Sequence, residues 1–214
     1  MRRHRSLTRR DALTASASGA VALIAGCLGG SEAAADPVES MPTPARGPED
    51  APVTVGVFED YACPHCRSFA TDVYPKLIAD YVDGGEVRYE HRDFPIPVHD
   101  RWSWEAPGAA RAVQDTAGVD AFFTFTRRLF ADGWENGSMA YSRSLLRTVA
   151  ADAGADPDTV VAAAGEGRYR PVIDADREAG ADLGVRGTPT VVVNGDVIEG
   201  ADYPAVQSAI EARL

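Results

Sequence analysis

Apolar and charged positions along the chain predict two strands with a helix between them. Residues 53–58, VTVGVF, are a short run of β-favouring apolar residues, which is typical of a buried strand. Residues 86–94, EVRYEHRDF, alternate between charged positions and apolar or aromatic ones, which predicts a second strand. Residues 69–81 carry an apolar or aromatic residue at every fourth position, which predicts a helix. A strand, a helix and a strand in this order predict a parallel crossover.

The next part of the chain, residues 99–184, has the spacing of helices. Three apolar stripes there have helical periodicity, and we interpret them as core faces. They lie at residues 122–130, 141–149 and 172–183. The strand pattern then returns in residues 188–200, where two β-favouring runs flank Asn194 and Gly195, a strong signal for a two-residue hairpin. The last residues, 201–214, predict a closing helix.

The first residues of the chain have the composition of an export signal. Residues 1–26 run from an arginine-rich start through a weakly apolar stretch to small residues before Cys27. Residues 8–13, TRRDAL, resemble a twin-arginine signal, and residues 24–27, IAGC, resemble a lipobox. The apolar stretch is short and alanine-rich for a permanent membrane span, so we expect a lipid anchor on Cys27 at the outer face of the cell membrane. The alternative is an amphipathic or buried N-terminal helix.

Residues 27–50 lack helical or strand periodicity and are rich in Gly, Ala, Pro and acidic residues. This composition predicts a flexible tether between the anchor and a domain that spans residues 51–214.

The charge of the chain is strongly negative. It has 32 acidic and 21 basic residues, and Lys76 is its only lysine. Removal of residues 1–26 takes away five arginines and one aspartate, which leaves a net charge near −15. Such a surface repels nucleic acid, so we expect no nucleic-acid partner. At about 1 M salt the screening length falls to about 3 Å, so the composition also predicts a salt-loving prokaryote as the source.

Two of the three cysteines lie in the sequence Cys63-Pro64-His65-Cys66, at the start of the first predicted helix. The N-terminus of a helix favours negative charge and therefore favours the thiolate form of a cysteine. The pair is a candidate redox catalyst, with a structural disulfide and half of a zinc site as alternatives. A disulfide here would close a very small loop and add little stability. A zinc site would need a second Cys-x-x-Cys, which the chain lacks, and His91 and His99 are eight positions apart.

The order of these elements and two separated motifs resemble a known family. The motifs are FEDYACPHC near residue 60 and GVRGTPTVVVNG about 120 residues later. With the helical block between them, they resemble the DsbA-like branch of the thioredoxin fold. This resemblance covers residues 49–214 and implies an α/β fold, with a central mixed sheet flanked by helices and a helical subdomain inserted at about residues 99–184.

The resemblance implies a protein thiol:disulfide oxidoreductase that needs neither a metal nor another cofactor. Cys63 would form a mixed disulfide with a substrate, and Cys66 would be the resolving cysteine. Pro64 and His65 form the dipeptide of the motif, and His65 would favour the reduced form and make the protein oxidising. The implied partners are cysteine-containing exported proteins and a second redox protein that recycles the pair.

The second motif implies a substrate site. By the same resemblance, Pro189 would follow a cis peptide bond, and Thr188 would offer its backbone to an extended substrate chain near Cys63. Two tryptophans in the sequence RWSWEAP, Trp102 and Trp104, could line a substrate groove, but core packing is an equally good interpretation.

One position departs from the thioredoxin pattern. Cytosolic thioredoxins have a buried acid six residues before the first cysteine, and Val57 occupies that position here. Glu59 and Asp60 are nearer to the cysteines, but the sequence leaves their direction open. A reductase is therefore less favoured than an oxidase, and a reductase or isomerase is kept as an alternative. A tethered domain that only binds exported proteins is a further alternative. We interpret His91 and His99 as surface residues of a strand and a loop.

Overall fold

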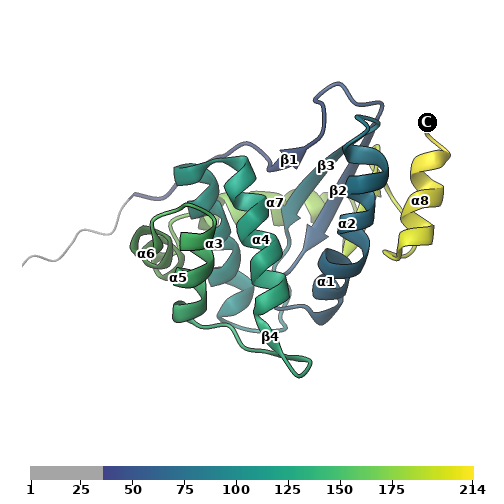
Figure 1. Cartoon of the computed structure of the whole chain (residues 1–214). Helices are drawn as coiled ribbons and strands as arrows, with labels where there is room; N and C mark the ends of the chain where they lie inside the picture. Colours follow the sequence, from purple (N-terminus) through teal and green to yellow (C-terminus); the bar gives the residue numbers. More distant parts are fainter. Residues whose placement is uncertain (1–35) are drawn as a thin grey trace, which may run out of the picture. The chain divides into compact units, whose positions relative to one another are not determined.

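A five-stranded mixed sheet forms the centre of the computed structural model, which describes residues 36–214 (Figure 1). The strands occur in the order β1-β3-β2-β6-β7. Their bounds are Ala45–Arg46 for β1, Val53–Glu59 for β2, Val87–Asp93 for β3, Thr190–Val193 for β6 and Asp196–Val197 for β7. Strands β2 and β3 are parallel, and the other neighbouring pairs are antiparallel. This arrangement confirms the predicted thioredoxin fold.

The connection between β2 and β3 is helical, as predicted, but it is not a uniform α-helix. It is divided into α1 (Pro64–Ser68), η1 (Phe69–Val73), α2 (Tyr74–Leu77) and η2 (Ile78–Val82), of which η1 and η2 are π-helical turns. Pro75 has no backbone N–H and cannot make the usual bond to the residue four positions earlier. The wider turn η1 before it closes instead with the bond from the Tyr74 N–H to the Phe69 carbonyl.

The hairpin predicted at Asn194 and Gly195 is present between β6 and β7. Both residues have positive φ angles, 49° and 90°, as a two-residue turn of this kind requires. The Asn194 side chain also accepts a hydrogen bond from the Thr54 N–H at 2.7 Å. The turn is thereby attached to the start of the neighbouring strand, β2. Helix α8 (Tyr203–Glu211) closes the chain.

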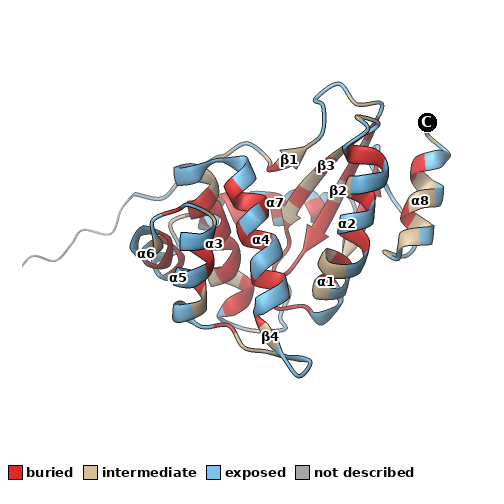
Figure 2. Cartoon of the chain, in the orientation of Figure 1, coloured by how far each residue is buried: buried red, intermediate tan, exposed pale blue. Residues whose placement is uncertain are grey.

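Five helices and one short hairpin lie between β3 and β6. Their bounds are Trp102–Ala117 for α3, Val119–Asp132 for α4, Arg143–Asp152 for α5, Pro157–Glu166 for α6 and Arg170–Asp182 for α7. Helix α3 packs against α4, α6 and α7 and is buried along much of its length (Figure 2). The hairpin joins β4 (Trp134–Glu135) to β5 (Ser138–Met139), and the sequence patterns did not predict it.

The prediction of a flexible tether is wrong for the last part of residues 27–50. The Val38 N–H donates to the Arg168 carbonyl at 2.9 Å, and the Pro42 carbonyl accepts from the Gln114 side chain at 2.8 Å. Strand β1 then pairs with β3. These separate contacts with the insertion and the sheet hold a segment that has no repeating pattern of its own. The proposed signal, Cys27 and the tether before residue 36 lie outside the described residues.

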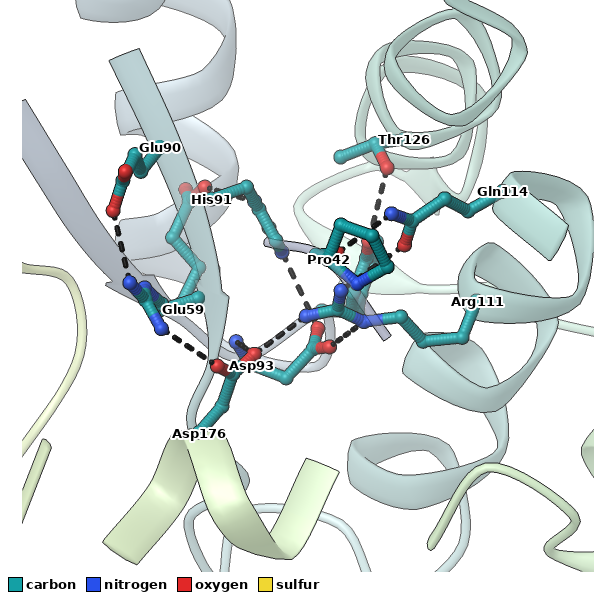
Figure 3. Close-up of polar contacts among 11 residues, drawn as sticks. Pro42, Glu59, Glu90, His91, Asp93, Arg111, Gln114, Thr126 and Asp176 are labelled. Atoms are coloured by element: carbon teal, nitrogen blue, oxygen red, sulfur yellow. Dashed lines mark hydrogen bonds and ion pairs between the residues drawn. The ribbon is translucent and has the colours of Figure 1, made fainter. Parts of the chain in front are cut away.

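A buried arginine joins the sheet to the helical insertion (Figure 3). Arg111 of α3 is 1% exposed, and its Nε donates to Asp93 of β3 at 2.7 Å. Its terminal nitrogen donates to Asp176 of α7, and the Asp176 carboxylate also accepts from the Asp93 backbone N–H. One guanidinium is therefore shared by two carboxylates that come from different layers of the fold.

Replacement of this arginine tests that connection. We expect Arg111→Met to lower the free energy of unfolding by about 3–5 kcal/mol, because two buried carboxylates lose their shared cation. Urea denaturation measures the loss. Arg128→Met is the control, since Arg128 pairs with Asp132 and Asp152 at the surface and its loss should change stability far less. Equal effects of the two substitutions would contradict this account.

Candidate active site

The two cysteines lie where strand β2 gives way to helix α1. Cys63 is the N-cap residue, with φ −86° and ψ 122°, and Pro64 occupies the first turn of the helix. The short loop before Cys63 is organised by Asp60, whose carboxylate accepts from the N–H groups of Ala62 at 2.7 Å and Ile96 at 2.8 Å. The Cys63 N–H donates to the Asp60 carbonyl at 3.0 Å. The position of Cys63 is thus fixed by backbone contacts on both sides.

The environment of Cys63 favours its thiolate. A hydrogen bond from the Cys66 thiol is the largest cause that lowers the pKa of Cys63 to about 5, although burial opposes the shift. The backbone N–H groups of His65 and Cys66 add to it, as expected at the start of a helix. The Thr188 side chain also favours the thiolate, and its hydroxyl has no hydrogen-bond partner within residues 36–214. Cys63 is therefore ionised at neutral pH.

Cys66 has the opposite environment. It is 0% exposed, and burial raises its pKa well above the ordinary value; its hydrogen bond to Cys63 and the charge of Glu59 act in the same direction. Both sulfurs are free thiols in this structure. The pair thus combines a nucleophilic thiolate with a buried, protonated thiol, which is the arrangement that thiol–disulfide exchange needs.

The second motif lies beside the first, as predicted. The peptide bond between Thr188 and Pro189 is cis. The Thr188 carbonyl is 3.4 Å from the Cys63 sulfur, so this loop forms a wall of the site. Both residues are half-buried, and the loop leads directly into β6.

The side chains of Pro64 and His65 are exposed. His65 acts on Cys63 through its backbone N–H, which is among the groups that lower the thiol pKa. Its predicted effect on the redox equilibrium through the imidazole stays a prediction.

The structure settles the direction of Glu59, which the sequence left open. Glu59 is 3% exposed, and burial raises the pKa of its carboxyl group. It lies two residues after Val57, and side chains two apart on a strand point to the same face of the sheet. A buried acid is therefore present near the cysteines, although not at the expected position. The two-residue spacing between Val57 and Glu59 was the signal in the sequence that could have identified Glu59 as the buried acid.

The interpretation of His91 as a surface residue is wrong. It is 1% exposed, and its two ring nitrogens face carboxylates on either side (Figure 3). Nδ1 is 3.1 Å from Glu59 Oε2, and Nε2 is 3.3 Å from Asp93 Oδ1. Burial opposes a charge on His91, but the hydrogen bonds to Asp93 and Glu59 outweigh it and raise the pKa to about 9. His91 is a cation at neutral pH.

His99 does lie in a loop, where its Nδ1 accepts from the N–H groups of Arg101 and Trp102 at the start of α3. The alternative of core packing holds for Trp102, which is 6% exposed and packs edge-on against Tyr141. Trp104 lies under the Arg170 guanidinium, in the wall of a 270 Å³ cavity between α3, α6 and α7. Within residues 36–214, no cluster of His, Cys, Asp and Glu has an arrangement that could hold a metal ion.

The helical insertion contacts the loop that carries Cys63. The Tyr61 carbonyl accepts a hydrogen bond from the Tyr141 hydroxyl at 2.9 Å. The Tyr61 hydroxyl bonds to the Thr126 hydroxyl at 2.9 Å, and its ring stacks on Phe130 with a centroid distance of 4.9 Å. The position of the loop is thus set from the insertion as well as from the sheet.

The acidity of Cys63 can be measured directly. The ultraviolet absorbance of the thiolate should titrate with a pKa of about 5 in the reduced protein. In Cys66→Ala the pKa should rise by about 1–2 units, because a hydrogen bond to a charged acceptor is lost. Cys63→Ser is the control that identifies the signal. An unchanged pKa in Cys66→Ala would show that the helix terminus alone stabilises the thiolate.

Comparison with known proteins agrees with this geometry. A family model described as Thioredoxin matches residues 39–212. Disulfide bond formation protein D of Bacillus subtilis is 29% identical over 84% of this chain and 82% of its own length. A probable disulfide bond formation protein D of Bacillus cereus is 27% identical over 78% of this chain and 77% of its own length.

Solved structures show the same architecture. Oxidised BdbD from Bacillus subtilis superposes with a TM-score of 0.73 at 29% identity, covering 84% of this chain and 98% of that one. DsbA of Chlamydia trachomatis has a TM-score of 0.69 at 20% identity, over 82% of this chain and 94% of its own, and supports the fold. This chain belongs to the thioredoxin family and is a DsbA-like thiol:disulfide oxidoreductase.

Proposed function

We propose that this protein is an oxidase that donates a disulfide from Cys63 and Cys66 to cysteines of exported proteins. The observation that carries the proposal is the stabilised thiolate of Cys63. A thiolate that is stabilised in the reduced protein makes the reduced form favourable, and the disulfide form is then a stronger oxidant. The name of the Bacillus subtilis relative, a disulfide bond formation protein, supports this direction.

The reaction begins with the Cys63–Cys66 disulfide. A substrate thiolate attacks the Cys63 sulfur, forms a mixed disulfide and releases Cys66 as a thiolate, which takes up a proton. A second thiolate of the substrate then attacks the substrate sulfur of the mixed disulfide and releases Cys63 as a thiolate. The substrate loses two electrons and the protein gains two. A second redox protein must then reoxidise the pair.

The loop at the second motif is the proposed substrate site. The Thr188 carbonyl lies beside the Cys63 sulfur, which supports the proposal that this backbone holds an extended substrate chain next to the mixed disulfide. Pro189 has no N–H, and its cis bond turns the chain at this point.

One observation favours a reductase or isomerase as a second candidate. Glu59 is a buried acid whose charge acts on Cys66, and a proton acceptor near the resolving thiol helps that thiol attack. The lowered pKa of Cys63 favours an oxidase, whereas the buried acid Glu59 near Cys66 favours the second candidate. The reduction potential separates the two.

Export and anchoring are proposed from the sequence. Residues 1–26 would be a twin-arginine signal, and Cys27 would carry the lipid that holds the domain at the outer face of the membrane. Within residues 36–214, no helix is long and apolar enough to cross a bilayer. The acidic composition further predicts that the protein folds best in strong salt.

The reduction potential of the pair decides the direction of the reaction. Equilibration of the purified domain with glutathione buffers should give a potential above about −180 mV, because the Cys63 thiolate is stabilised. A value near −270 mV, as in thioredoxin, would favour the reductase instead. Cys63→Ser should abolish disulfide transfer while leaving the fold intact; activity that survives this change would overturn the mechanism.

The lipid anchor has its own test. In the native host, Cys27→Ala should release the protein from the membrane fraction, because the attachment point is lost. Ser31→Ala, a change beyond the lipobox, is the matched control and should leave the protein in that fraction. Retention of the Cys27→Ala protein would remove the anchor from the proposal.

A further inference from the structure

A chain of buried charges runs from Glu59 to the helical insertion (Figure 3). The N–H of the residue after Glu59, Asp60, donates to the Cys66 sulfur at 3.4 Å. The chain of charges begins at Glu59 on β2, continues through His91 and Asp93 on β3, and reaches Arg111 on α3 and Asp176 on α7. Each member is 10% exposed or less. The charges alternate in sign, so His91, Asp93 and Arg111 each lie between two groups of opposite charge.

The geometry at His91 requires a proton toward each neighbour. Asp93 accepts a hydrogen bond at one ring nitrogen, and a Glu59 oxygen faces the other at 3.1 Å. A neutral imidazole has one N–H and one lone pair, and its lone pair would face a carboxylate oxygen. The structure therefore fits a state in which Glu59, His91 and Asp93 together hold two protons, one on each side of the imidazole ring. Loss of one would leave an uncompensated negative charge in the core.

Asp93 does not supply or take up these protons. Burial alone would raise its pKa, but the charge of Arg111 and the bond to His91 hold it at about 2. Asp176 is on the far side of the same guanidinium. Burial raises the pKa of Asp176, but Asp176 contacts Arg111 and not His91. The protons on the two sides of the His91 ring are therefore held by Glu59 and His91, which we call the buried proton pair.

Glu59 connects the buried proton pair to the cysteines and to a small cavity. Its Oε1 has no hydrogen-bond partner among the described residues, and neither has the Tyr74 hydroxyl. Both residues line a cavity of about 10 Å³, which also borders His91 and Arg127. That space is about enough for one water molecule, which could carry protons to and from Glu59. A negative charge on Cys63 raises the pKa of Glu59, and the charge of Glu59 raises the pKa of Cys66.

We propose that His91 is a positioning residue of the redox centre, and that the proton it shares with Glu59 is bound more tightly when the cysteines are reduced. The inference rests on the proposed redox function of Cys63 and Cys66. Reduction places a negative charge on Cys63, which attracts a proton to the buried proton pair. Linkage is reciprocal, so the protonated pair stabilises the reduced form by the same factor and strengthens the disulfide as an oxidant.

Other groups face the buried proton pair from each neighbouring element. Tyr61 and Tyr89 are neutral, since burial raises their pKa values well above the ordinary range. Tyr74 lies on α2, and burial likewise raises its pKa. Arg127 on α4 stands at the cavity and keeps its charge. Asp60 and Asp176 are two further buried acids nearby, and burial raises the pKa of each. The carboxylates that face the His91 ring nitrogens are those of Glu59 and Asp93, so the titration of His91 reports on the buried proton pair.

Imidazole nitrogen chemical shifts of the complete domain measure the linkage directly. We expect His91 to titrate at higher pH in the reduced protein than in the oxidised protein, with a difference in proton affinity of about threefold or more. His99→Gln is the control, because His99 lies in a loop outside the buried charges and its removal should leave the redox dependence of the His91 shifts unchanged. An equal titration of His91 in the two states would overturn the proposal.

Substitution of His91 provides a second readout. We plot the logarithm of the equilibrium constant with glutathione, corrected for the ionisation of glutathione, against pH. The slope of this plot should change near pH 9 in the wild type and in His99→Gln, but not in His91→Gln. A change of slope near pH 9 that persists in His91→Gln contradicts the linkage. If His91→Gln does not fold, the wild-type titrations decide. A potential near that of thioredoxin would overturn the oxidase alone, since the redox dependence of the His91 titration is measured independently.

Discussion

Asp93 lies between two buried cations, and the relation between the sheet, the helical insertion and the cysteine pair depends on its charge. His91 donates to one of its oxygens and Arg111 to the other. A buried charge is stable only while its neighbours compensate it, so removal of any one of the three alone lowers the stability of the protein. Because Arg111 belongs to the insertion and Asp93 to β3, this contact joins the insertion to the sheet that carries the redox motif.

The same two cysteines acquire different chemistry because they lie at different depths of the helix start. Cys63 precedes the first turn, where N–H groups are available to its sulfur, and Cys66 lies one turn later against the core. The hydrogen bond between them strengthens the contrast, since the proton that Cys66 keeps is the proton that stabilises Cys63 as a thiolate. The carboxylate of Glu59 adds to it by opposing a second negative charge at Cys66. A pair that is symmetric in sequence is therefore asymmetric in function.

The sequence predicted the features that depend on local chemistry. The central strands, the cysteine pair at a helix start, the hairpin at Asn194 and the cis bond before Pro189 all follow local signals or the family motif. The burial of His91 was missed although His91 shares the buried face of β3 with Val87 and Tyr89. A charged histidine is tolerated there only because Asp93 and Glu59 flank it, and the sequence left the direction of Glu59, on another strand, open. The tether was mistaken because the contacts of residues 38–46 are separate bonds to distant elements. The β4–β5 hairpin has the same turn signal, with Asn136 before a glycine, but its strands of two residues are too short to show alternation.

Tyr61 makes hydrogen bonds to the hydroxyls of Tyr141 and Thr126, and these two bonds limit how far this fold can be shortened or combined with other domains. The bonds to Tyr141 and Thr126 mean that part of the catalytic loop's support is supplied by the insertion. Deletion of the insertion would leave the Cys63–Cys66 motif in the chain. It would remove the side chains that hold the loop between β2 and Cys63. The helical subdomain is therefore not an interchangeable module on a self-sufficient catalytic unit. A minimal version of this enzyme would need a new support for that loop, and transplantation of the motif into a bare thioredoxin scaffold should not carry its properties along.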